Sequence, residues 1–106
     1  MAPDRLSMLL QFVEQNPKDP FARYGLALEY KNRGQLDQAA AAFATLIELQ
    51  PDYTAAYLHS GNTLVALGRS DDARAVYQAG MAACQRKGDA HALSELQAAM
   101  AGLQPT

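Results

Sequence analysis

The sequence predicts an all-α solenoid in which antiparallel helix pairs stack side by side. Alanine is very common, whereas Val, Ile and Thr are scarce, and this composition favours helix over sheet. In addition, a pattern of residues recurs after 34 positions. The matching pairs are Gly34 with Gly68, Asp37 with Asp71, Ala39 with Ala73, and Phe43 with Tyr77. A fixed period of this length is the signature of a repeat architecture.

Composition narrows the class of protein. The 106 residues are 49% hydrophobic and 19% charged, as expected for one globular domain. A net charge of −2 offers no basic face for a nucleic acid. The single cysteine, Cys84, excludes an intramolecular disulfide and a cysteine-based metal site. No apolar run is long enough to span a membrane, and the N-terminal stretch lacks the pattern of a signal peptide. We therefore expect a soluble cytoplasmic protein that binds neither nucleic acid nor membranes.

The spacing of apolar residues, together with residues that begin or end helices, predicts about six helices. They are expected at residues 4–16, 20–33, 38–50, 55–67, 71–87 and 89–101. Side chains expected to cap helix N-termini are those of Asp4, Asp19, Thr54 and Asp89. Glycines expected to end helices stand at positions 34, 68 and 88.

The repeated positions resemble the tetratricopeptide repeat family. That family places Leu-Gly and Tyr on the first helix of each repeat, and Ala, an aromatic residue and Pro on the second. The matching residues are Leu26, Ala27, Tyr30, Ala39, Phe43 and Pro51 in the first repeat, and Tyr57, Gly61, Ala73 and Tyr77 in the second. Departures from the pattern are Arg23, Ser60, Leu64 and Gln85.

The resemblance implies a right-handed superhelical solenoid and one domain over residues 1–106. Within it, residues 4–16 form an N-terminal helix, 20–53 and 54–87 form the two repeats, and 89–101 form a C-terminal capping helix. The small residues Ala27, Ala39, Gly61 and Ala73 are expected to let helices approach closely, and Tyr30, Phe43 and Tyr77 to fill the space between them.

The resemblance also implies a concave groove, lined by the first helix of each repeat, that takes a peptide or helix of a partner protein. The groove positions are Phe21, Tyr24, Leu28, Lys31 and Asn32 from the first repeat and Leu58, Asn62 and Val65 from the second. An alternative is that these residues pack against one another or against the terminal helix. Exposed apolar surface on a small protein usually marks an interface, which favours the groove.

The groove positions also discriminate among partners. Family members that bind acidic C-termini use Lys and Asn on the groove helices. Here Tyr24 and Leu28 stand at the matching first-repeat positions, and only Asn62 is of the required type. We therefore expect no binding of acidic C-terminal tails. An apolar extended segment or an amphipathic helix is the better match.

Residue types that carry chemistry do not form a recognisable constellation. His59 and His91 are far apart and have no ligand partner at helical spacing. Cys84 is expected to be a small buried apolar residue, and Ser60 and Ser94 lie within predicted helices. The sequence therefore predicts a protein without catalytic residues, metal or cofactor.

The leading hypothesis is a non-catalytic adaptor that binds a protein partner, of unknown identity, in the groove. The alternative is a homo-oligomerisation module, such as a homodimer, with Tyr24, Leu28 and Leu58 as its seam. An RNA-binding repeat ranks last, because Lys31 is the only basic residue among the groove positions.

Overall fold

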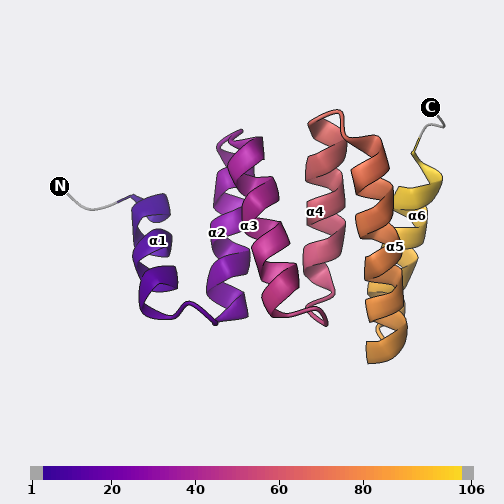
Figure 1. Cartoon of the computed structure of the whole chain (residues 1–106), viewed down its shortest axis with the longest axis horizontal. Coiled ribbons are helices and arrows are strands. Elements are labelled where there is room, and N and C mark those ends of the chain that lie inside the picture. Colours follow the sequence, from indigo (N-terminus) through magenta and orange to yellow (C-terminus); the bar gives the residue numbers. More distant parts are fainter. Residues whose placement is uncertain (1–3, 104–106) are drawn as a thin grey trace.

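The computed structural model describes residues 4–103, which form six helices joined by short turns. The helices are α1 (Arg5–Gln15), α2 (Pro20–Asn32), α3 (Leu36–Leu49), α4 (Ala55–Ala66), α5 (Ser70–Lys87) and α6 (Ala90–Ala101). Figure 1 shows them standing side by side in chain order, with α1 at one end of the row and α6 at the other. The molecule measures 47 × 29 × 19 Å, as expected for a single row of stacked helix pairs. The predicted all-α repeat solenoid is confirmed.

Three aspartates begin helices as the sequence predicts. Asp4 accepts a hydrogen bond from the Ser7 amide at 2.8 Å. Asp19 accepts from the amides of Phe21 and Ala22, and Asp89 accepts from the Ala92 amide. Each carboxylate satisfies amides that have no partner inside the helix.

Three helices end at glycines in the left-handed conformation: α2, α4 and α5, the last at Gly88 with φ 71°. Gly34 has φ 75° and Gly68 has φ 79°. After each of them the chain turns back, so that the amide of Gln35 reaches the Tyr30 carbonyl and that of Arg69 reaches the Leu64 carbonyl. Residues with a side chain rarely adopt this conformation, so the 34-residue spacing of the two glycines sets the spacing of the helix pairs.

The prediction that Thr54 caps α4 is wrong. Thr54 has a helical backbone, with φ −62° and ψ −33°, and makes no capping hydrogen bond. Its hydroxyl instead donates to the Asp89 carboxylate at 2.7 Å. The charged acceptor ties the start of α4 to the start of α6. The predicted start of the third helix at Gln38 is also late, because α3 begins at Leu36.

The core consists of two clusters, one for each repeat. The first contains Ala27, Ala39, Phe43, Leu46 and Ala56. The second contains Tyr57, Leu64, Ala73, Tyr77, Ala83, Cys84 and Leu96. Two of the predicted aromatic fillers are buried, since Phe43 is 0% and Tyr77 2% exposed, whereas Tyr30 is half-buried against the first cluster. Ile47 packs against both clusters, so the interior continues from α2 to α6, whereas α1 contains no buried residue.

Candidate functional site

The first helices of the successive pairs, α2, α4 and α6, adjoin one another and form what we call the first-helix face. The rings of Tyr24 on α2 and His59 on α4 lie 5.7 Å apart, and α4 also packs on α6. The predicted groove residues differ in exposure along this face. Phe21 is 77% and Val65 39% exposed, Asn32 and Asn62 are exposed, and Tyr24, Leu28, Lys31 and Leu58 are half-buried.

The middle of the face is an aromatic cluster rather than an open groove. Tyr24 lies edge-on to Phe43, with ring centres 6.4 Å apart, and its ring centre is 5.4 Å from that of Tyr53. His59 stacks on Phe43 at 6.0 Å. Burial raises the pKa values of Tyr24 and Tyr53. Tyr24 is therefore half-buried and packs against Phe43 and Tyr53.

His59 joins the two repeats, and the pKa of its imidazole is lowered. The Lys31 ammonium nitrogen lies 3.5 Å from His59 Nδ1. Burial lowers the pKa of His59, and the positive charge of Lys31 lowers it further. A neutral imidazole can accept a hydrogen bond from Lys31, whereas an imidazolium would repel it. The single basic residue among the predicted groove positions is thus engaged within the protein.

At the C-terminal side of the face, Asn62 and Val65 line a hollow of about 320 Å³. The remaining walls come from Tyr77 and from Ala99, Gly102 and Leu103 in and after α6. The Tyr77 hydroxyl donates to Asn62 Oδ1 at 2.5 Å, which fixes the orientation of the amide. From the sequence, residues 89–101 were expected only to form a capping helix. In the structure, α6 also supplies one wall of this hollow.

At the N-terminal side, Phe21 belongs to a different hollow, of about 240 Å³, between α1 and α2. Its other walls are Arg5, Leu9, Phe12, Ala22 and Gly25. Three of the eight predicted groove residues therefore line these two hollows, Phe21 in one and Asn62 and Val65 in the other, with the aromatic cluster between them. The contribution of α1 was not predicted. The sequence does contain a signal for these packing positions on α1, because the 34-residue shift places Leu9 and Phe12 on the core residues Phe43 and Leu46.

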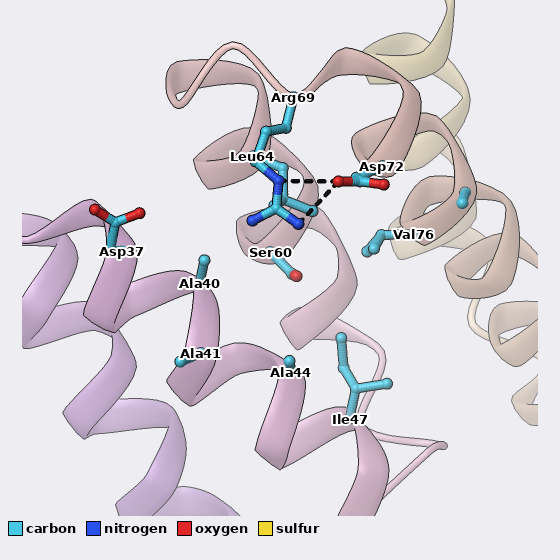
Figure 2. A pocket seen from close by; sticks show the side chains of 11 residues that line it. Asp37, Ala40, Ala41, Ala44, Ile47, Ser60, Leu64, Arg69, Asp72 and Val76 are labelled. Carbon is cyan, nitrogen blue, oxygen red and sulfur yellow. Dashed lines mark hydrogen bonds and ion pairs between the residues drawn. The ribbon is translucent and has the colours of Figure 1, made fainter.

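A larger hollow, of about 520 Å³, lies between the second helices α3 and α5, with α4 as its floor. Figure 2 shows the Ser60 side chain on this floor, with its hydroxyl directed toward the space between Ala44 and Val76. Ser60 is only 3% exposed. At the rim, Arg69 pairs with Asp72 at 2.8 Å. Sequence reasoning noted that Ser60 replaces the usual leucine but did not infer the hollow that follows from the missing volume.

Comparisons with known proteins agree with this geometry. The tetratricopeptide repeat family profile matches residues 24–87, which is more than half of the chain. The chain belongs to the tetratricopeptide repeat family. Comparison with curated protein sequences finds no match.

Solved tetratricopeptide repeat domains show the same arrangement of helices. The solution structure of a tetratricopeptide repeat domain protein from Salinibacter ruber is 39% identical and has a TM-score of 0.79. The match covers 85% of this chain and 94% of that one. A crystal structure of a tetratricopeptide repeat domain from the same organism is also 39% identical, with a TM-score of 0.75, and covers 81% of this chain and 100% of that one. A protein from Bordetella parapertussis is 26% identical with a TM-score of 0.79, over 94% of this chain and 87% of that one.

The residues that could carry chemistry are dispersed in this repeat fold. Across residues 4–103 no group of three or more His, Cys, Asp or Glu side chains is arranged to hold a metal ion. Cys84 is 1% exposed, and burial raises the pKa of its thiol. A thiol of raised pKa in an apolar interior is a poor nucleophile, which agrees with the packing role expected from the sequence. Within the same residues, no helix is long and apolar enough to cross a membrane.

Proposed function

We propose that this protein is a non-catalytic adaptor that binds an apolar segment of a partner protein on its first-helix face. Membership of the repeat family supports a role in protein–protein interaction or as a scaffold in general. The observation that carries the finer proposal is the placement of exposed apolar side chains. Phe21 and Val65 are both large, exposed and apolar, and each borders a hollow, which for Phe21 lies between α1 and α2 at one edge of the first-helix face and for Val65 between α4 and α6.

The two hollows favour a segment with two apolar anchors. One anchor would lie beside Phe21 and the other beside Val65, and the aromatic cluster would form the surface between them. Apolar side chains in small desolvated pockets contribute most of the binding energy of such contacts. An extended strand or an amphipathic helix can present two apolar side chains to the same surface.

An acidic C-terminal tail does not suit this surface. Lys31 lies against His59, and Tyr24 and Leu28 pack on the first core cluster. Few donors therefore remain for a terminal carboxylate. We expect that a peptide with an acidic C-terminus will show no sub-micromolar binding in a calorimetric titration.

The homodimer seam at Tyr24, Leu28 and Leu58 is less favoured. All three side chains are half-buried and pack against the two core clusters, so little of their apolar surface is available to a second copy. The cytoplasmic location remains a prediction of the sequence.

Affinity capture from cell lysate tests the proposal with variants at exposed positions. The Phe21→Glu/Val65→Glu variant introduces charge at both hollows without opening the core. Leu49→Glu on α3 is the matched control, because Leu49 is also apolar and 40% exposed but borders neither hollow. We expect proteins retained by the wild type and by Leu49→Glu to be lost with the double variant. Equal retention by all three, when circular dichroism shows them folded, would contradict the proposal.

A further inference from the structure

Helix α1 has the residue frame of a second repeat helix but lacks the cover that such helices receive. The 34-residue shift places Arg5, Leu9 and Phe12 on Ala39, Phe43 and Leu46 of α3. The three residues of α3 are each 0% exposed, because α2 packs on one side of α3 and α4 on the other. In α1, by contrast, Phe12 is 49% exposed and no residue is buried.

The uncovered side of α1 is an apolar groove. Arg5, Met8, Leu9 and Phe12 line a hollow of about 330 Å³, which adjoins the smaller hollow beside Phe21. Met8 is 56% exposed. In the pairs α2–α3 and α4–α5, the corresponding side is covered by an antiparallel first helix. By analogy with these pairs an antiparallel helix is the expected cover for the groove, and within residues 4–103 no helix occupies it.

We propose that a second copy of this chain covers this groove, with the α1 helices of two copies packed antiparallel about a two-fold axis. The exposed ridge beside the α2 contact consists of Arg5, Met8, Phe12 and Gln15. Their spacings of three, four and three residues read the same in both directions. In an antiparallel pair centred on position 10, Met8 faces Phe12 of the other copy and Arg5 faces Gln15. Apolar residues then meet apolar residues, and polar residues meet polar residues.

The opposite end of the solenoid offers no such complement. On α6, Leu96 is 0% exposed, and the exposed positions carry Ala, His, Ser, Glu and Gln. Head-to-tail stacking would therefore place the apolar groove against a polar helix. A self-complementary end opposite a polar end permits a closed dimer but not an open filament.

The size of the end face sets the expected strength. The 29 × 19 Å cross-section of the molecule, about 550 Å² in each copy or about 1,100 Å² in total, is a ceiling for the contact, because α1 has 11 residues and spans only about 16 Å of it. Specific interfaces bury upwards of about 1,000 Å², and those near this limit are weak. We expect a dimer that dissociates at micromolar rather than nanomolar concentrations. It leaves the hollow beside Val65 free for partners but shares Arg5 and Phe12 with the hollow beside Phe21.

Sedimentation velocity of the full chain, from about 5 to about 500 μM, tests this proposal. The wild type is expected to shift from monomer to dimer across the range. Phe12→Glu is expected to raise the dissociation constant by at least about 30-fold, because a charge would be buried in the pair. Val65→Glu is the matched control, since Val65 is also exposed and apolar but lies on α4, and it is expected to dimerise like the wild type. Thermal melts by circular dichroism establish that the variants are folded.

A charge pattern tests the antiparallel register. In the proposed pair, Met8→Lys/Phe12→Glu brings opposite charges together, whereas Met8→Glu/Phe12→Glu brings like charges together. The first variant should therefore dimerise at least about 10-fold more tightly than the second. A wild type that stays monomeric over the whole range overturns the proposal. A Phe12→Glu variant that dimerises as tightly as the wild type also overturns it, as do two charge patterns that dimerise equally tightly. Loss of dimer in Val65→Glu places the interface elsewhere and likewise overturns it. None of these outcomes decides the partner binding proposed above, which is measured by affinity capture with Phe21→Glu/Val65→Glu and not by self-association.

Discussion

The two repeats follow one 34-residue frame but fill it with different side chains. In the first repeat, α2 presents Leu26 and Ala27, and the aromatic filler is Phe43. In the second, α4 presents Ser60 and Gly61, and the filler is Tyr77. A Cβ atom on Gly61 would lie 2.2 Å from the Tyr77 ring, so α4 and α5 pack more closely than an alanine would allow. Each small residue is thus matched to its own aromatic partner.

The same comparison extends to a second pair of positions. Leu46 of the first repeat corresponds to Gly80 of the second. Leu46 is 0% exposed and fills its own space. A Cβ atom on Gly80 would lie 2.5 Å from Tyr57 and 2.9 Å from Leu96, so side chains from α4 and α6 occupy that space instead. The second repeat therefore depends on close backbone approach, whereas the first depends on side-chain volume.

The largest expected effect is the loss of an aromatic filler in the first repeat. Phe43→Ala should lower the free energy of unfolding by about 3–5 kcal/mol, because a fully buried aromatic side chain leaves a cavity. Urea denaturation followed by circular dichroism measures the change. A midpoint within experimental error of the wild type would mean that the first repeat does not rely on this volume.

A smaller loss is expected when the close approach in the second repeat is blocked. Gly61→Ala should cost about 1–3 kcal/mol through overpacking against Tyr77. The matched change in the first repeat, Ala27→Gly, removes a methyl group and should cost about 1 kcal/mol, chiefly in helix propensity. Adding Tyr77→Leu should recover part of the Gly61→Ala loss in a double-mutant cycle. Additive losses would show that the two residues do not share this space.

Filling the hollow above Ser60 should stabilise the protein. Ser60→Leu places the leucine of the first repeat into the corresponding position of the second, and should raise the free energy of unfolding by about 0.5–2 kcal/mol. Leu26→Ser is the reciprocal control and should be destabilising. Differential scanning calorimetry reports both shifts. If Ser60→Leu lowers the melting temperature, the hollow is too shallow to accept the side chain.

The smallest effect is pH-dependent and centres on the junction between the repeats. The pKa of His59 is lowered in the folded protein, first by burial and then by Lys31, so the unfolded chain binds the proton more readily. The stability associated with a neutral His59 is present above about pH 6.5 and is lost as the pH falls below this value. Asp4 and Asp89 have lowered pKa values and lose their contributions only below about pH 4.

Denaturation at pH 7.5 and pH 5.0 should therefore show lower stability at the acidic pH, and His59→Gln should reduce the difference. A wild-type difference that His59→Gln leaves unchanged would assign the dependence to other groups.

Local rules were sufficient to predict much of the fold. Periodicity located the helix pairs, and glycine and aspartate chemistry located most of their ends. Thr54 shows where local rules fail, because its hydroxyl reaches Asp89, which is 35 residues away in the sequence. Capping depends on the backbone conformation at the cap, and residue type alone does not determine that conformation.

The candidate site was less predictable than the fold because it depends on contacts between repeats. The family frame identified Phe21 and Val65 as groove residues, and both are exposed beside hollows. It could not show that Tyr24 would be covered by Tyr53, which lies in the turn before α4, and by His59, which lies on α4. Comparing α1 with α3 in the same frame could have shown that Phe12 lacks cover.

Site-specific photo-crosslinking most directly tests the claim that the first-helix face binds a partner. A benzoylphenylalanine is introduced in place of Val65 and, separately, in place of Leu49 as the control. Irradiation in cells followed by mass spectrometry then identifies the attached peptides. We expect the Val65 position to crosslink to an apolar segment of another protein and the Leu49 position to give no such product. Crosslinking of the same proteins from both positions, or from Leu49 alone, would contradict the claim.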